Sequence, residues 1–250
     1  LLLWARQPIK SAGKILRKRP QKTITQLSPG VEEYFSPVFT WTEKLLGGNK
    51  DRIIRQNIQH LEQFIRLHGP VDIIHAHVGY PAGFIARKIS EFFKIPYVIT
   101  EQMSPFPHRQ FLKKGLLEPG LMSAYEHARL NIAISNSLAV DMENQGIKRI
   151  VVIPNLVDDA FFTAKPSNLT GAKFTFLALG RMVSQKGIDI LLHAFAWLNP
   201  DAVLRIGGGG PNLYRYQQMA RSLNIQDKVI WLGVLTRDQA PEEFRNCQAF

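Results

Sequence analysis

The stretch that decides the fold lies at residues 177–195 and reads LALGRMVSQKGIDILLHAF. It begins as a continuous apolar run, typical of a strand that is covered on both faces, and it ends with apolar residues at helical spacing. Two glycines and two cations stand at the junction, namely Gly180, Arg181, Lys186 and Gly187. The stretch therefore predicts a buried parallel strand, a short loop and an amphipathic helix.

The loop of this unit has the composition of an anion site. Ligands of open parallel sheets collect at the carboxyl ends of the strands, where a glycine lets them approach the backbone. The N-terminus of the following helix adds amide donors and a positive dipole end. Arg181 offers a planar fork to phosphate oxygens, and Lys186 offers a compact charge. We expect a phosphate or diphosphate site here; the alternative is that both cations are solvated surface residues.

The remaining sequence alternates between short apolar strands and helical patterns. Strands are expected at residues 71–77, 95–101, 131–135, 149–155, 173–180, 202–207 and 228–233. Helices are expected at residues 51–69, 81–93, 119–130, 136–146, 185–198, 212–223 and 237–246. Asp51 is the expected N-cap of the first helix, and Pro81 is expected at the first position of the second.

The alternation predicts an α/β fold of two Rossmann-like, doubly wound domains that face a cleft. The expected N-terminal domain is 1–157, a linker rich in Pro, Ser, Asn and Gly is 158–172, and the C-terminal domain is 173–250. The last residues, CQAF, indicate a strand that is just beginning. Both domains are therefore expected to be incomplete in this chain.

Composition limits the class of protein and its partners. The 250 residues are 45% hydrophobic and carry a net charge of +11, which is typical of a globular protein that binds anions. The single cysteine, Cys247, excludes an internal disulfide and fits a reducing, cytoplasmic compartment. No apolar run approaches the roughly 20 residues that a membrane span needs. The basic stretch 10–22 is expected either to rest on the inner face of an anionic membrane or to be a solvated charge run.

Three polar residues lie near strand ends in the first half. His77 is at the carboxyl end of its strand, which favours a functional role, whereas His75 is expected to pack in the core. Glu101 follows the next strand, where it either accepts hydrogen bonds from substrate hydroxyls or caps a loop. No Cys or carboxylate lies at metal-ligand spacing from the histidines, so no metal is expected. The glycines at 207–210 indicate a tight turn or, less specifically, a phosphate loop.

Five motifs together carry a family resemblance. They occur in the order DIIHAHVGYPAG, VVIPNLVD, LALGRMVSQKGIDILLHAF, LRIGGGGP and VIWLG between residues 72 and 233. In this order the chain resembles the retaining glycosyltransferases of the family 4 type, or glycosyl transferases group 1, which have the two-domain GT-B fold. The similarity covers about residues 71–250, and Leu156 stands where the family has a glycine in P-N-G-V-D.

The resemblance implies a site. Arg181 and Lys186 would bind the donor diphosphate beside Gly180, and Val234 would border the base. His77 would lie at the donor sugar and the acceptor, with Glu101 on the acceptor side. The family's segments before and after these motifs are not identifiable, so the chain is expected to be a fragment lacking both ends, whose own activity stays open.

The resemblance also implies a reaction, that of a hexosyltransferase in polysaccharide biosynthesis. A sugar would pass from a UDP or GDP sugar to a glycan, lipid-linked or small-molecule acceptor, with retention and with protein cations in place of a metal. A second reading is an epimerase on the same fold, which would turn over a nucleotide sugar without an acceptor. A third is a basic nucleic-acid-binding protein; it is disfavoured because no such motif is present and the basic residues are not interleaved with aromatics.

Overall fold

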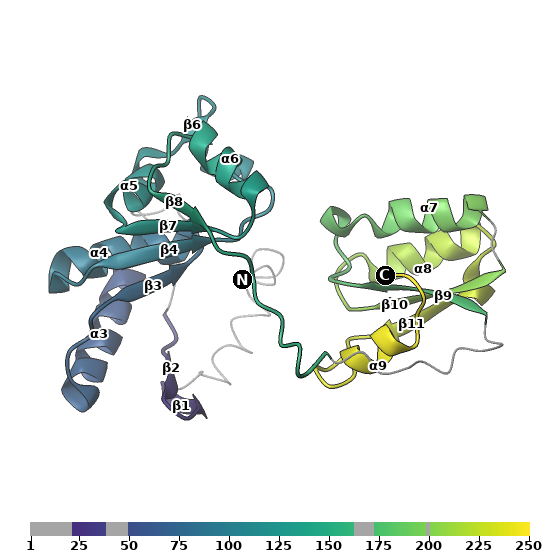
Figure 1. The fold of residues 1–250 in the computed structure, drawn as a ribbon, viewed down its shortest axis with the longest axis horizontal. Helices are drawn as coiled ribbons and strands as arrows, with labels where there is room; N and C mark the ends of the chain where they lie inside the picture. The colour runs from purple at the N-terminus through teal and green to yellow at the C-terminus, as the bar shows by residue number, and fades with distance from the viewer. Residues whose placement is uncertain (1–21, 39–49, 163–172, 199–200) are drawn as a thin grey trace, which may run out of the picture. The chain divides into compact units, whose positions relative to one another are not determined.

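The structure is a computed structural model that describes residues 22–38, 50–162, 173–198 and 201–250. The chain separates into two compact units, unit 1 at residues 1–155 and unit 2 at residues 156–250 (Figure 1). The expected linker began at residue 158, but its described part, 158–162, belongs to unit 2. The rest of that linker and nearly all of the basic stretch 10–22 lie outside the described residues.

Unit 1 contains a four-stranded parallel sheet, as expected. Its order is β3 (Ile74–His77), β4 (Tyr97–Glu101), β7 (Leu130–Ala133) and β8 (Ile150–Val152). The helices are α3 (Lys50–His68), α4 (Phe84–Phe93), α5 (Pro119–His127) and α6 (Asn136–Asn144). Helix α3 packs against α4, and α4 packs against α5 (Figure 1). The core between helices and sheet includes Ile99, Ala124, Tyr125 and Met142, all at most 1% exposed.

Two expected helix starts in unit 1 are corrected. Helix α3 already includes Lys50, so Asp51 lies in the first turn, where its charge favours the helix dipole, instead of forming the N-cap. Regular helix α4 begins at Phe84, because residues Gly79–Gly83 form a wide π-type turn that contains the non-helical Tyr80. Pro81 is therefore part of this turn and not the first residue of the helix.

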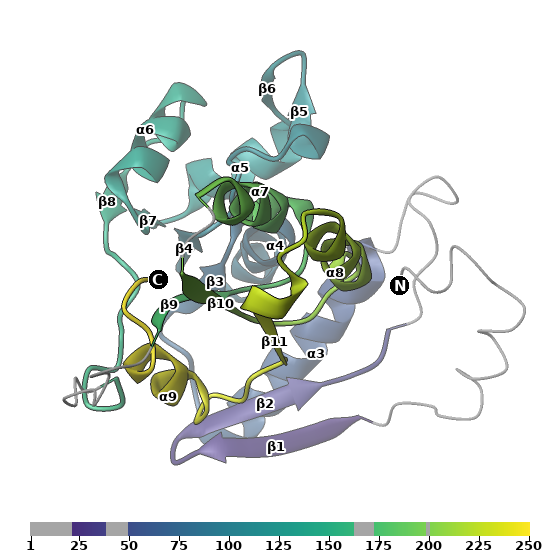
Figure 2. The ribbon, with the colours of Figure 1, turned by 90° about the vertical axis from the view of Figure 1, so that its right-hand side faces the viewer.

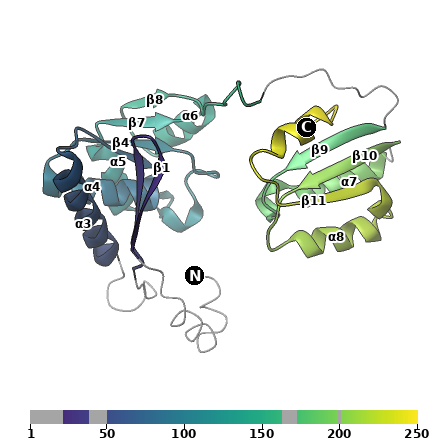
Figure 3. The same cartoon turned by 90° about the horizontal axis from the view of Figure 1, so that it is seen from below.

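Unit 2 has a three-stranded parallel sheet in the order β11 (Val229–Gly233), β10 (Ala202–Gly207) and β9 (Phe174–Leu179). Helices α7 (Ile188–Leu198) and α8 (Leu213–Ser222) cover one face, and α9 (Ala240–Arg245) lies on the other (Figures 1 and 3). The core side chains Leu192, Leu204 and Tyr216 are fully buried. Both faces of the strands are thus covered, which explains their continuous apolar runs.

The last residues pair with the sheet at the place where the sequence indicates that a strand begins. Ala249 forms a parallel bridge with Phe176, and its carbonyl accepts a 2.8 Å hydrogen bond from the Leu177 amide. Strand β9 therefore has a neighbour on each side, β10 and the 249 segment. The chain runs outward from β9 to β11 and then returns to the far side of β9. This reversal is a topological switch point, the place where open parallel sheets bind ligands.

Two hairpins were not predicted. Strands β1 (Thr23–Ser28) and β2 (Val31–Phe35) pair antiparallel around Gly30, whose φ is 76° (Figure 2). Strands β5 (Leu112–Lys113) and β6 (Leu116–Leu117) form a second, very short pair. All six residues of β1 are exposed. Its sequence therefore lacks the alternation of apolar and polar residues that predicts a half-buried strand. Within the described ranges, no helix is long and apolar enough to cross a membrane.

The packing of α7 gives a test of the unit 2 core. Leu192 is 0% exposed and Ile190, two residues earlier in the same helix, is 73% exposed. We expect Leu192→Ala to lower the free energy of unfolding of unit 2 by about 2–5 kcal/mol, because the buried cavity cannot close fully. Ile190→Ala is the matched control and should stay within about 0.5 kcal/mol. Hydrogen exchange of the β9–β11 amides measures both; equal effects would show that α7 is not packed as described.

Candidate functional site

Three loops at the carboxyl edge of the unit 2 sheet are joined through their backbones. The Gly180 amide donates to the Gly207 carbonyl at 3.0 Å, and the Met182 amide donates to the Gly209 carbonyl at 3.0 Å. The Gly208 amide donates to the Gly233 carbonyl at 2.6 Å. The loops that follow β9, β10 and β11 therefore form one continuous surface.

The glycines at 207–210 are needed because backbones approach one another closely. A Cβ on Gly208 would lie 1.9 Å from the Gly180 carbonyl oxygen, and one on Gly210 would lie 2.8 Å from that of Met182. The φ angles of Gly208 and Gly210, 132° and 155°, also favour glycine. The Gly180 and Gly208 amides already donate within the protein, so they are not free to bind an anion at this surface.

A concavity of about 570 Å³ lies over this surface, within the usual range of roughly 300–1,000 Å³ for small-molecule sites. It is lined by Leu179, Gly180, Arg181, Gly207, Gly208, Gly209, Gly210, Val234, Leu235, Thr236, Arg237 and Ala240. Three predicted donor-site residues thus come together: Gly180, Arg181 and Val234. The fourth, Lys186, is adjacent, since its aliphatic carbons lie 3.7 Å from the position of a Cβ on Gly180.

The side chains at this concavity are cationic. Arg181 and Lys186 are exposed, and neither has an ion-pair partner among the residues that the structure describes. Arg237 is a third cation, which sequence reasoning missed although it closely follows the end of β11. Its guanidinium contacts Asp158 at 3.2 Å and lies 4.7 Å from the centre of the Phe161 ring. Both contacts orient Arg237, although an exposed ion pair adds little stability.

In unit 1, the two histidines of β3 lie on the same exposed face, while Ala76 between them is buried. Their rings stack with centroids 4.5 Å apart. The expectation that His75 packs in the core is wrong, because the alternation of a strand puts it on the same side as His77. His75 instead contacts the Thr100 hydroxyl at 2.7 Å; desolvation, and then the neighbouring His77, lower the pKa of His75. His77 Nδ1 is 3.1 Å from the Gln102 amide nitrogen.

Glu101 is 0% exposed and accepts four hydrogen bonds. The donors are the Gly79 amide at 2.8 Å, the Tyr125 hydroxyl at 2.5 Å, and the Gln102 and Met103 amides at 2.8 and 2.7 Å. Its carboxylate is thus a loop cap, the alternative that the sequence left open, and it presents no surface to a substrate hydroxyl. Burial, and then Glu101 itself, raise the pKa of Tyr125 above its usual value, so its hydroxyl remains a donor.

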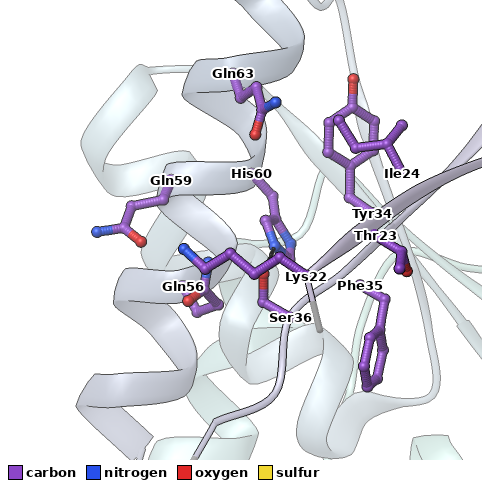
Figure 4. Close-up of a pocket in the computed structure, with 10 residues that line it drawn as sticks. All are labelled: Lys22, Thr23, Ile24, Tyr34, Phe35, Ser36, Gln56, Gln59, His60 and Gln63. Atoms are coloured by element: carbon purple, nitrogen blue, oxygen red, sulfur yellow. Dashed lines mark hydrogen bonds between the residues drawn. The ribbon is translucent and has the colours of Figure 1, made fainter. Parts of the chain in front are cut away.

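A second concavity, of about 250 Å³, lies between the β1–β2 hairpin and α3 (Figure 4). Glutamines of α3 and residues of both strands line it, and Ser36 Oγ meets His60 Nε2 at 2.7 Å. Desolvation, followed by Lys22, lowers the pKa of His60. None of the residues predicted to be functional lines this concavity, whereas three of them line the concavity of unit 2, which is therefore the candidate site.

Comparisons with known proteins identify the family of the chain. The family described as Glycosyltransferase Family 4 matches residues 29–161, and Glycosyl transferases group 1 matches residues 160–250. An uncharacterized glycosyltransferase of Bacillus subtilis, YqgM, is 25% identical over 92% of this chain and 62% of its own length. The alpha-monoglucosyldiacylglycerol synthase of Streptococcus pneumoniae is 29% identical over 69% of this chain and 43% of its own length.

Among solved structures, Anabaena Alr3699/HepE in complex with UDP superposes with a TM-score of 0.63 at 20% identity. The similarity covers 78% of this chain and 55% of that protein. The chain thus spans about two-fifths to three-fifths of the length of these proteins.

The glycine contacts give a test of the site's construction. Gly208 and Gly233 both have positive φ, but a Cβ on Gly233 has nothing within 4 Å. We expect Gly233→Ala to lower the free energy of unfolding of unit 2 by about 1–2 kcal/mol for the left-handed backbone alone. Gly208→Ala should cost about 1–3 kcal/mol more, because the Gly180 carbonyl must move. Denaturant titration followed by hydrogen exchange measures both; equal losses would contradict the close approach of the two loops.

Proposed function

The chain belongs to glycosyltransferase family 4, and on that premise we propose that it transfers a sugar from a nucleoside diphosphate to an acceptor hydroxyl with retention of configuration. Its two α/β units have parallel sheets of the GT-B type. The observation that carries the proposal is the concavity at the β9 switch point, which gathers Gly180, Arg181 and Arg237 over a glycine surface. Retention is the stereochemistry that the family resemblance implies.

The chemistry of the concavity suits a nucleoside diphosphate. When the bond to the sugar breaks, negative charge grows on the leaving diphosphate. Arg181 and Lys186 would stabilise that charge more in the transition state than in the ground state, which is what accelerates a reaction. Arg237, held by Asp158, adds a third positive charge at the same surface. The exposed side chain of Val234 and the neighbouring Leu235 provide an apolar wall for the base.

The donor is proposed to be a UDP or GDP sugar, and the UDP bound by Alr3699/HepE supports the first. The acceptor is proposed to be a glycan, a small molecule or a lipid-linked sugar. A lipid-linked acceptor is favoured by the similarity to the alpha-monoglucosyldiacylglycerol synthase, whose name contains a glycolipid. His77 is the proposed acceptor-side residue of unit 1. The family membership favours a transferase over the epimerase reading, and the expected cytoplasmic location and membrane contact remain predictions.

Cations supplied by the protein would make a divalent metal unnecessary. We expect transfer from the donor sugar to keep at least about half of its rate after treatment with EDTA, because Arg181, Lys186 and Arg237 supply the positive charge. The rate with and without added Mg²⁺ or Mn²⁺ is the measurement. A loss of transfer with EDTA that Mg²⁺ or Mn²⁺ restores would refute the metal-free mechanism.

The two predicted cations can be tested by binding. We expect Arg181→Ala and Lys186→Ala each to weaken binding of UDP or GDP, while uridine or guanosine binds nearly as before. Each should lower the transfer rate by roughly 30- to 1000-fold, which corresponds to a loss of about 2–4 kcal/mol of transition-state stabilisation. Arg181→Lys should recover only part of the rate, because a point charge cannot replace the fork.

Lys173→Ala is the matched control. Lys173 precedes β9 at the opposite edge of the same sheet, where it pairs with Asp201 at 2.7 Å. Its removal should leave diphosphate affinity unchanged by calorimetry. If Arg181→Ala and Lys186→Ala behave like Lys173→Ala, both cations are ordinary surface residues and the donor-site assignment fails.

A further inference from the structure

The backbone immediately after His77 is held in an unfavourable conformation. Val78 has φ 68° and ψ 147°, a region that is essentially reserved for glycine. Its own groups are fixed on both sides, since its amide donates to the Thr100 carbonyl at 2.8 Å and its carbonyl accepts from Gly83 at 3.0 Å. The next amide, of Gly79, donates to Glu101 at 2.8 Å. The surroundings, and not the preference of valine, thus determine the course of this loop.

Glu101 connects the loop after β3 to the loop after β4. One carboxylate oxygen accepts from Gly79 and from the Tyr125 hydroxyl, and the other accepts from the Gln102 and Met103 amides. Tyr125 brings in α5 as a third element. Its hydroxyl lies 2.0 Å from the position of a Cβ on Gly79, so only glycine fits there. We refer to Glu101, Tyr125 and the Gly79 amide as the carboxylate clamp.

The clamp leads directly to the ring of His77. It fixes the backbone of Gln102, and the side-chain amide of Gln102 reaches His77 Nδ1 at 3.1 Å. As the side-chain amide of Gln102 is placed, its nitrogen faces the ring and donates, which makes Nδ1 the acceptor. In a neutral imidazole with Nδ1 as acceptor, the proton is on Nε2. His75 stacks against the same ring and limits its rotation.

We propose that Glu101, Tyr125 and Gln102 are positioning residues for His77, and that Gln102 selects the tautomer with the proton on Nε2. His77 then offers an N–H donor, and its ligand is a hydrogen-bond acceptor such as a sugar hydroxyl or a phosphate oxygen. A histidine with a bare Nε2 would instead act as a base. The consequence for transfer rests on the proposed function, whereas the tautomer does not.

The tautomer can be read from the ring ¹⁵N chemical shifts of His77 in the labelled chain. We expect the wild type to show the Nε2–H form. Gln102→Glu should convert His77 to the Nδ1–H or the doubly protonated form. The new carboxylate can only accept a hydrogen bond, so Nδ1 must then carry a proton, whereas the wild-type amide donates to Nδ1. Gln102→Ala should give a mixture of both neutral forms. A wild-type ring protonated on Nδ1, or a tautomer unchanged in Gln102→Glu, would overturn the proposal.

Tyr97→Phe is the matched control for the clamp. Tyr97 and Tyr125 are 2% and 1% exposed, and the Tyr97 hydroxyl also donates to a buried acceptor, the Ala124 carbonyl at 2.6 Å. We expect Tyr125→Phe to disturb the His77 ring shifts and Tyr97→Phe to leave them as in the wild type. Equal disturbance by both, or none by Tyr125→Phe, would show that the clamp does not position His77.

Kinetics then separates this proposal from the proposed function. We expect Gln102→Glu and Tyr125→Phe to lower kcat by about 10- to 100-fold, as misplaced reacting groups do, with the donor KM within about twofold. Wild-type kcat in both variants would overturn a positioning role in transfer. The expected ring shifts in a protein that transfers no sugar would instead refute the proposed function and leave the tautomer assignment standing.

Discussion

The close approach of the Gly180–Met182 backbone to the glycines at 207–210 is the constraint on which the candidate donor site depends. It joins the loops after β9 and β10, and the Gly208 bond to Gly233 adds the loop after β11. These bonds use backbone donors that a phosphate loop would normally offer. The proposed affinity for a diphosphate therefore relies on the exposed cations Arg181 and Lys186 beside this glycine surface. Positive charge placed at this surface would stabilise the negative charge that develops on the leaving diphosphate during the reaction.

Much of the fold could be predicted from sequence, because short apolar runs typical of strands alternate with helical patterns along the chain. The beginning of a strand that CQAF indicated corresponds to a single parallel bridge from Ala249 to Phe176. The β1–β2 hairpin was missed because none of its strand residues is fully buried, so its sequence carries no apolar alternation. The starts of α3 and α4 were misplaced because capping and turn geometry depend on contacts that residue types alone do not specify.

The residues of the candidate site could be predicted where they follow one another in a single loop. They could not be predicted where their placement depends on contacts with distant residues. Gly180 and Arg181 follow a strand directly, and they line the concavity as expected. Arg237 was missed because its partner Asp158 lies 79 residues away in sequence. For Glu101, substrate binding stayed open as one of two roles. The sequence cannot show that the Tyr125 hydroxyl and three backbone amides donate to its carboxylate. Arg237 and His77 are thus contacted by residues distant from them in sequence, Asp158 and Gln102.

The most direct test of the central claim is a titration of UDP into the ¹⁵N-labelled chain, followed by amide chemical shifts. If the donor diphosphate binds at the β9 switch point, the largest changes will fall on residues 180–187, 207–210 and 234–237, and uridine will reproduce only those near 234. Changes centred instead on the concavity between the β1–β2 hairpin and α3, or an absence of changes around Arg181, would contradict the account.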